Sequence, residues 1–230
     1  MSTSKKIAIE VDAELRVSGL IDAADDARFA LVLAHGAGAG MTHAFMETVA
    51  RGLAERRIAC LRYQFPYMER GSKRPDAPPL AHATVRAAVA RAAAHFHGLP
   101  LFAGGKSFGG RMTSQAQALG LLPEVTGLVF LGFPLHAAGK PSIDRAAHLH
   151  DIDVPMLFVH GAQDKLAEPP CFAQVVDSLG DWASVDEYAA ADHGFHVPKK
   201  SGLTDAQVIE QMLDAVAMWM QAWLLDGVIA

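Results

Sequence analysis

Cysteine is nearly absent from this 230-residue sequence, which contains only Cys60 and Cys171. The two residues lie far apart and form neither a C-x-x-C motif nor a zinc-ligand spacing, which excludes a disulfide scaffold and a structural zinc finger. An apolar secretion signal is also missing, because the polar start Met1–Lys6 is followed by an alternating, partly acidic stretch. We therefore expect a cytoplasmic protein in a reducing compartment.

The sequence lacks an excess of positive charge and long apolar runs. Its 20 basic and 25 acidic residues give a formal charge of -5, which argues against nucleic acid or an anionic membrane as a partner. The apolar-rich stretch 212–230 is interrupted by Asp214, Gln221 and Asp226, so it indicates an amphipathic helix rather than a membrane span. Nothing in these patterns indicates an oligomeric state.

Aromatic residues are scarce at 7%, but hydrophobic residues make up 51% of the chain. A chain of this length can bury a core that needs neither disulfides nor a structural metal, so we expect a single domain over residues 1–230.

Short apolar runs alternate along the chain with helical patterns. Such alternation predicts an α/β fold, with a mainly parallel sheet, helices on both faces and the site at the carboxyl ends of the strands. The predicted strands are Phe29–Ala34, Ile58–Tyr63, Pro100–Ala103, Thr126–Leu131, Val154–Val159 and Val185–Tyr188, preceded by a hairpin of Ile7–Val11 and Leu15–Gly19. The predicted helices are Ala44–Arg57, Leu80–Phe96, Phe108–Leu119, Pro170–Leu179 and Thr204–Leu225.

Gly105-Lys106-Ser107-Phe108-Gly109 matches G-x-S-x-G between a predicted strand and a predicted helix. This is the context of a nucleophile elbow, whose tight turn requires small residues two positions before and two after the serine. The elbow would hold the Ser107 hydroxyl at a helix N-terminus, where backbone dipoles favour an oxyanion.

A serine nucleophile needs a histidine base and an acid that orients it. Asp164 follows a predicted strand and His193 lies in a loop after the last one, which gives the order Ser, Asp, His of an α/β-hydrolase. Asp144 is an alternative acid, and His196 is an alternative base. Asp192, next to the histidine, is interpreted as a supporting or solvent residue.

The glycine-rich loop Ala34–Gly40 follows the first parallel strand. In an acyl-transfer enzyme, backbone N–H groups of Ala37 and Phe108 would bind the tetrahedral oxygen, His35 would support the loop, and Gly38 would leave room for substrate. A dinucleotide fingerprint fails because Met41 stands where glycine or alanine is needed, and a P-loop fails because its first glycine would be Pro100. We expect no metal and no cofactor.

The long loop Gln64–Pro79 starts at the carboxyl end of a strand and contains Arg70, Lys73 and Arg74, to which Lys106 adds a further cation beside the serine. These cations predict attraction of anionic substrates, and the alternative is a solvated loop whose cations pair with Glu69 and Asp76.

About 22 residues separate Leu131 from Val154, too few for a helical cap. We therefore expect an open pocket for short acyl groups, with one side walled by Phe133, Pro134, Leu135 and Phe195.

These motifs resemble the α/β-hydrolase superfamily over nearly the whole chain. Within this superfamily, two segments are similar to those of small predicted hydrolases of the dienelactone-hydrolase-like group. They are the loop His35–Gly38 and the segment Phe65–Glu69, which is followed by Arg70, Lys73, Arg74, Pro75 and Asp76. The resemblance implies an eight-stranded, mainly parallel sheet without a large cap, a triad of Ser107, Asp164 and His193, and a role for Tyr67 of the similar loop in binding substrate. Dienelactone hydrolases proper are associated with a cysteine nucleophile, so lactone specificity does not carry over.

The expected function is hydrolysis of a small carboxylic ester or thioester through an acyl-enzyme. The alternatives are a catalytically silent binding or scaffold protein that kept the elbow, and an acyltransferase that uses the same triad.

Overall fold

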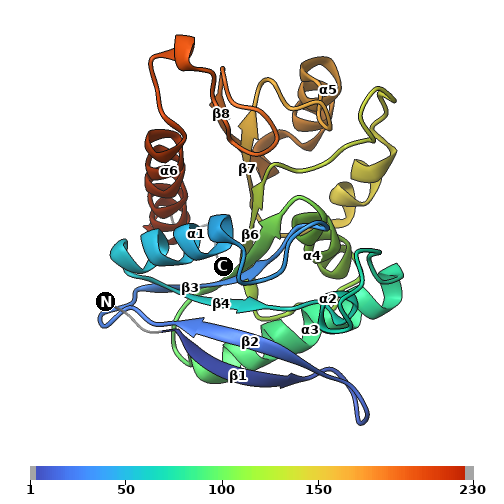
Figure 1. Ribbon diagram of the computed structural model, residues 1–230, viewed down its shortest axis with the longest axis vertical. Coiled ribbons are helices and arrows are strands. Elements are labelled where there is room, and N and C mark those ends of the chain that lie inside the picture. Colours follow the sequence, from blue (N-terminus) through green and yellow to red (C-terminus); the bar gives the residue numbers. More distant parts are fainter. Residues whose placement is uncertain (1–3, 226–230) are drawn as a thin grey trace.

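Eight strands form one sheet, and helices cover both of its faces (Figure 1). The structure, a computed structural model, describes residues 4–225, with side chains up to residue 222. The spatial order of the strands is β1-β2-β4-β3-β5-β6-β7-β8. β1 and β2 pair antiparallel, β2 pairs antiparallel with β4, and all other neighbouring strands are parallel. The predicted α/β-hydrolase architecture is thereby confirmed.

The strands are β1 Lys5–Glu10, β2 Arg16–Asp22, β3 Phe29–Ala34, β4 Ile58–Tyr63, β5 Leu101–Lys106, β6 Val125–Leu131, β7 Met156–Gly161 and β8 Ala183–Tyr188. The α-helices are α1 Ala44–Glu55, α2 Pro66–Glu69, α3 Pro78–His95, α4 Phe108–Ala118, α5 Pro169–Leu179 and α6 Asp205–Leu225. The 3-10 helices are η1 Asp144–Asp151, η2 Gly180–Trp182 and η3 Lys199–Ser201.

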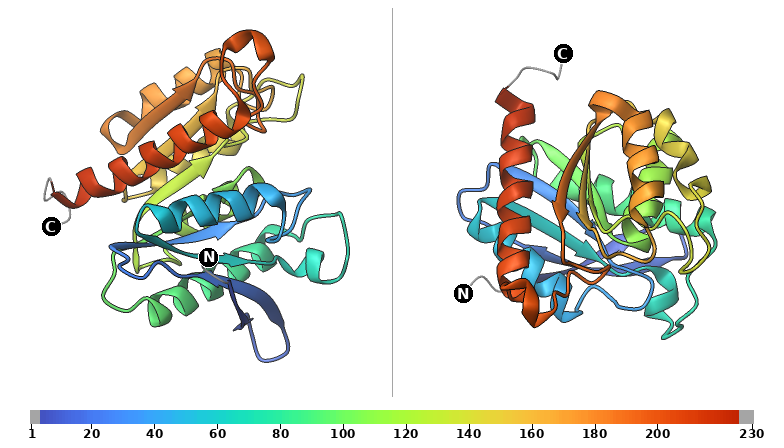
Figure 2. Two further views of the ribbon diagram at one scale, coloured as in Figure 1. Left: turned by 60° about the vertical axis from the view of Figure 1, so that its left-hand side comes forward. Right: turned by 90° about the horizontal axis from the view of Figure 1, so that it is seen from above.

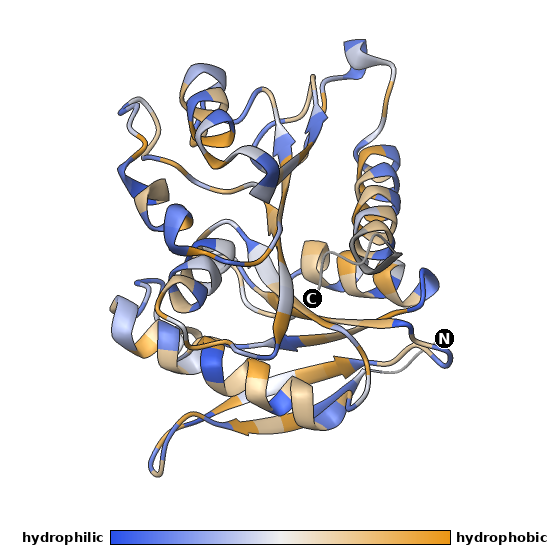
Figure 3. Ribbon diagram, turned by 180° about the vertical axis from the view of Figure 1, so that it is seen from behind, coloured by the Kyte–Doolittle hydropathy of each residue, from blue (hydrophilic) through white to orange (hydrophobic). Residues whose placement is uncertain are grey.

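Two apolar cores explain why the central strands are continuously hydrophobic. Residues of α3, α4 and α5 pack on one face of the sheet, and residues of α1 and α6 pack on the other (Figure 2). Every residue of β3, β4 and β7 is buried, because each strand lies between these two layers. Figure 3 shows the resulting pattern of hydrophobic central strands and helices of mixed hydropathy.

Most predicted boundaries agree with the structure to within two or three residues. β5 extends past Ala103 to Lys106, because Gly104 to Lys106 continue the parallel register beside β6. The short helix α2 was not predicted. It begins at Pro66, and the carboxylate of Asp76 accepts a hydrogen bond from the Tyr67 N–H at 2.8 Å.

The segment between β6 and β7 contains only η1, so the prediction of no large cap is confirmed. Within residues 4–225, no helix has the length and apolar character needed to cross a membrane. The predicted last helix corresponds to α6, and residues 226–230 of the apolar-rich tail lie outside the described residues.

Candidate active site

Ser107 lies in a sharp turn between β5 and α4, with φ 52° and ψ -115°. This backbone conformation is sparsely populated for residues other than glycine, and such strain is often found at functional sites. A Cβ atom on Gly109 would lie 2.6 Å from the His35 carbonyl oxygen, and one on Gly105 would overlap the carbonyl of Ala34. The turn therefore requires the two glycines that the sequence pattern contains.

Three side chains from separate loops form one hydrogen-bonded row. His193 Nε2 lies 2.8 Å from Ser107 Oγ, and His193 Nδ1 lies 2.6 Å from Asp164 Oδ2. The carboxylate accepts a hydrogen bond from the Nδ1–H group, so Nε2 is unprotonated and can accept the serine proton. This is the arrangement that a nucleophile, a base and an orienting acid require.

Asp164 is held in a charged state although its side chain is fully buried. Burial alone raises the pKa of this carboxyl. The hydrogen bonds from His193 and the Leu166 N–H, with the positive charge of Lys106, outweigh burial and lower the pKa below its usual value. The acid is thus ionised where it contacts the imidazole.

Hydrogen bonds from two side chains, Asp192 and Lys106, fix the loop that carries His193. Asp192 Oδ1 accepts hydrogen bonds from the N–H groups of Gly194 and His196, at 2.8 and 3.0 Å. The Lys106 ammonium also donates a hydrogen bond to the His193 carbonyl oxygen. Asp192 is thus a supporting residue, and its carboxylate shapes the turn around the histidine.

The glycine-rich loop after β3 is fixed by His35 and Tyr67. The Phe65 N–H donates to His35 Nε2 at 3.0 Å, so His35 Nδ1 carries the proton and donates to the Gly36 carbonyl at 2.8 Å. The Tyr67 hydroxyl donates to the Ala37 carbonyl at 3.0 Å. Because C=O and N–H point in opposite directions in a trans peptide, holding the Gly36 carbonyl directs the Ala37 N–H away from His35.

Ser107 lines a pocket of about 360 Å³. Ala37 and Phe108, the two residues whose N–H groups could bind a tetrahedral oxygen, line the same pocket. Phe108 is the first residue of α4, so its N–H has no partner within the helix. The other lining residues are Pro75, Asp76, Pro78, Arg111, Met112, Pro134, Arg145 and Leu166.

The family comparison agrees with this geometry, since residues 27–221 match the model of the α/β-hydrolase domain. The chain belongs to the α/β-hydrolase family. A search among curated proteins found no match.

Solved structures similar to this α/β-hydrolase share its fold at low sequence identity. A dienelactone hydrolase from Anabaena variabilis ATCC 29413 is 19% identical, with 98% of each chain covered and a TM-score of 0.73. An α/β serine hydrolase without a lid from Xanthomonas campestris is 18% identical, with 100% of this chain and 97% of that chain covered and a TM-score of 0.69. Est1E from Butyrivibrio proteoclasticus is 13% identical, with 96% and 99% covered and a TM-score of 0.73.

Four predicted substrate-binding residues of this α/β-hydrolase are not in the wall of the pocket. Tyr67 is buried and supports the Ala37 loop, and Phe133 is buried against Phe130 and Phe158 in the core. Phe195 is buried on the opposite face of the sheet, and the Lys106 ammonium lies 5.2 Å from the centre of its ring. These side chains do not line the pocket, because they are packed against other parts of the protein.

The cations of the Gln64–Pro79 loop also lie outside the pocket wall. Arg70 pairs with Asp76 at 2.6 Å, as the alternative interpretation of a solvated loop expected, and Arg74 is exposed. Gly38 follows Ala37 in the glycine-rich loop but does not line the pocket, and a Cβ atom there would meet open space. The loop does border the pocket, but through Pro75, Asp76 and Pro78.

The alternative acid and base lie away from the row. Asp144 is exposed at the start of η1. His196 Nδ1 lies 2.9 Å from Asp205 Oδ2 on the surface, and its pKa is raised by that carboxylate. Within the described residues, His193 and Asp164 are therefore the pair that meets Ser107.

Sequence reasoning missed Arg111 and Arg145, which both line the pocket. Arg111 could have been found, because it lies in the first turn of the predicted helix Phe108–Leu119, which begins directly after Ser107. Arg145 comes from η1, and no pattern in the sequence links it to the elbow.

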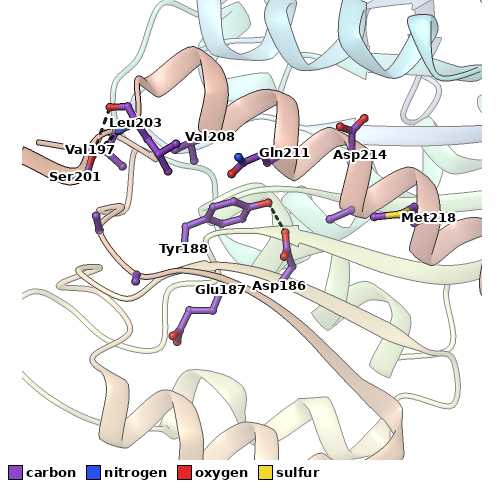
Figure 4. A pocket seen from close by; sticks show the side chains of 13 residues that line it. Asp186, Glu187, Tyr188, Val197, Ser201, Leu203, Val208, Gln211, Asp214 and Met218 are labelled. Atoms are coloured by element: carbon purple, nitrogen blue, oxygen red, sulfur yellow. Dashed lines mark hydrogen bonds between the residues drawn. The ribbon is translucent and has the colours of Figure 1, made fainter. Parts of the chain in front are cut away.

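A second cavity, of about 610 Å³, lies between β8 and α6 (Figure 4). Its polar side chains include Asp186, Glu187 and Asp214, and the Tyr188 hydroxyl donates to Asp186 at 2.6 Å. No member of the Ser107 row lines this cavity, so the chemistry of the site does not involve it.

Proposed function

We propose that this α/β-hydrolase cleaves small carboxylic esters or thioesters through an acyl-enzyme on Ser107. The observation that carries the proposal is the hydrogen-bonded row Ser107–His193–Asp164, whose serine lines a pocket. In this proposal His193 takes the serine proton as Ser107 Oγ attacks the substrate carbonyl carbon, and Asp164 stabilises the imidazolium that forms.

The negative charge that develops on the carbonyl oxygen would be bound by the N–H groups of Ala37 and Phe108. The N-terminus of α4 adds the positive end of the helix dipole at the same place. Collapse of the tetrahedral species breaks the bond to the leaving group, which takes the proton from His193. Water then attacks the acyl-enzyme with His193 acting again as base, and Ser107 recovers its proton when the acid leaves.

The size of the pocket supports a small substrate. A volume of about 360 Å³ is near the lower end of typical ligand sites. With only η1 between β6 and β7, no helical cap is present over this site within the described residues. Short, soluble esters fit these dimensions better than long-chain lipid emulsions.

Labelling by a fluorophosphonate and hydrolysis of a panel of short esters and thioesters test the proposal. We expect the wild type to be labelled and active, and Ser107→Ala to lose the label and at least about 10³-fold in kcat. Ser72→Ala is a matched control at a half-buried position that does not line the pocket, and it should behave like the wild type. Full hydrolysis by Ser107→Ala, or no labelling of the wild type, would overturn the proposal.

A further inference from the structure

Two arginines face the same pocket as Ser107. Arg111 is one helical turn beyond the serine on α4, and its N–H donates to the Ser107 carbonyl oxygen at 3.1 Å. Arg145 lines the same pocket from η1.

Among the described residues, no ion pair joins Arg111 or Arg145 to a carboxylate. Arg111 Nε is moreover buried and has no hydrogen-bond partner within this part of the chain. Leaving a buried donor unpaired costs free energy, and the cost is larger when the group is charged.

Among the described residues that line the pocket, Asp76 is the one carboxylate, and it already accepts two hydrogen bonds. Asp76 accepts hydrogen bonds from the Tyr67 N–H at 2.8 Å and from Arg70 at 2.6 Å, one on each oxygen. Arg145 adds positive potential at Arg111, since burial and the charge of Arg145 lower the pKa of the Arg111 guanidinium. Burial and the charge of Arg111 lower the pKa of His148 to about 4, so this imidazole is neutral at neutral pH. The guanidinium itself stays protonated at neutral pH.

We propose that this pair of arginines, Arg111 and Arg145, binds a carboxylate of the substrate, so that the preferred substrates are half-esters or half-thioesters of short dicarboxylic acids. This inference rests on the proposed function and names its substrate class. A planar carboxylate can accept two parallel N–H bonds from one guanidinium, which would satisfy the unpaired Nε of Arg111. The bound carboxylate would hold the scissile carbonyl over Ser107.

The test compares ethyl hydrogen glutarate with ethyl glutaramate, in which an amide of the same shape replaces the carboxylate. We expect kcat/KM for the carboxylate to exceed that for the amide by at least about tenfold at low salt, and to fall toward it at high salt. Arg111→Gln and Arg145→Gln should each reduce this ratio. Arg145 is partly exposed on a short surface helix, so its replacement keeps the test valid even if Arg111→Gln folds poorly.

Arg51→Gln is the matched control, because Arg51 is exposed on α1 across the sheet from α4 and the substitution removes the same charge. This variant should keep the wild-type ratio. Equal kcat/KM for both esters in the wild type, or an unchanged ratio in both Arg111→Gln and Arg145→Gln, would overturn the inference. A higher kcat/KM for ethyl 4-phosphonobutanoate than for the glutarate ester would show that the anion is a phosphate group instead.

A binding measurement separates this inference from the proposed function. Glutarate should bind to Ser107→Ala in calorimetry, and the added Arg111→Gln change should weaken its affinity at least about tenfold. Such binding without hydrolysis of any ester would support the anion site and overturn the esterase proposal. Hydrolysis of neutral esters without glutarate binding would support the esterase proposal and overturn the anion site.

Discussion

Lys106 donates a hydrogen bond from its side-chain ammonium to the backbone carbonyl oxygen of His193. The residue that precedes the candidate nucleophile in sequence therefore supports the loop that carries the candidate base. The ammonium also lies 5.2 Å from the centre of the ring of Phe195, which follows His193 by two residues in the same loop. Burial lowers the pKa of Lys106 to about 8, although the charges of Asp164 and Asp192 oppose this shift.

A pH dependence follows from this contact. Above pH 8 the neutral amine is a weaker donor to the His193 carbonyl, so we expect kcat for a short ester to decline as Lys106 loses its proton. Lys106→Met should have a lower kcat than the wild type at pH 7 and should lack this decline. The same alkaline decline in Lys106→Met would contradict the assignment.

The control is the stability of the fold over the same pH range. The folded pKa of Lys106, about 8, is below the ordinary value of 10.5, so between these values the unfolded chain binds more protons than the folded chain. This group therefore makes the wild type more stable, relative to Lys106→Met, as pH rises from 8 to 10.5. Thermal unfolding of both proteins at each pH distinguishes this gain from a loss of activity caused by unfolding.

Asp164→Asn tests the acid. An amide in place of the carboxylate no longer stabilises the imidazolium or the Nδ1–H tautomer, so kcat should fall on the order of 10³-fold with the fold intact. Asp144→Asn makes the same change at the exposed alternative and should leave kcat near the wild-type value. The acid would have to be reassigned to Asp144 if the second variant were the more impaired one.

Gly109→Ala tests the packing of the elbow. The added Cβ would lie 2.6 Å from the His35 carbonyl oxygen, which is backbone and cannot move without displacing β3. We expect a loss of about 1–3 kcal/mol in the free energy of unfolding, measured by urea denaturation. Gly38→Ala, whose Cβ would meet open space, should be close to neutral in the same assay. Equal stabilities of the two variants would show that the elbow tolerates a side chain.

Arg62→Met tests an ion pair buried between β2 and β4. Arg62 contacts both oxygens of Asp22, at 2.8 and 2.9 Å, and its side chain is only 2% exposed. Its removal leaves a buried carboxylate uncompensated, so we expect a loss of about 3–5 kcal/mol in unfolding free energy. Arg57→Met removes the exposed pair with Asp26 and should cost at most about 1 kcal/mol. A small loss in Arg62→Met would indicate that water reaches Asp22.

The sequence by itself determined the order of strands and helices along the chain and the position of the nucleophile elbow. Both depend on local rules: continuous apolar runs form strands that are covered on two faces, and Gly105 and Gly109 permit the turn at Ser107. The positions of Asp164 and His193 after two strands also follow from the sequence, because the carboxyl ends of parallel strands meet at one edge of the sheet.

Only the tertiary structure decided which side chains face the pocket. Lys106 is next to Ser107 in sequence, but its side chain donates a hydrogen bond to the backbone of the His193 loop. The Tyr67 hydroxyl likewise donates to the backbone of the glycine-rich loop at Ala37. Arg111 and Arg145 come from α4 and η1, and they share a pocket because these two elements pack together. Hydropathy and spacing describe one segment at a time, whereas contacts between distant segments depend on how the side chains of all layers fill the same space.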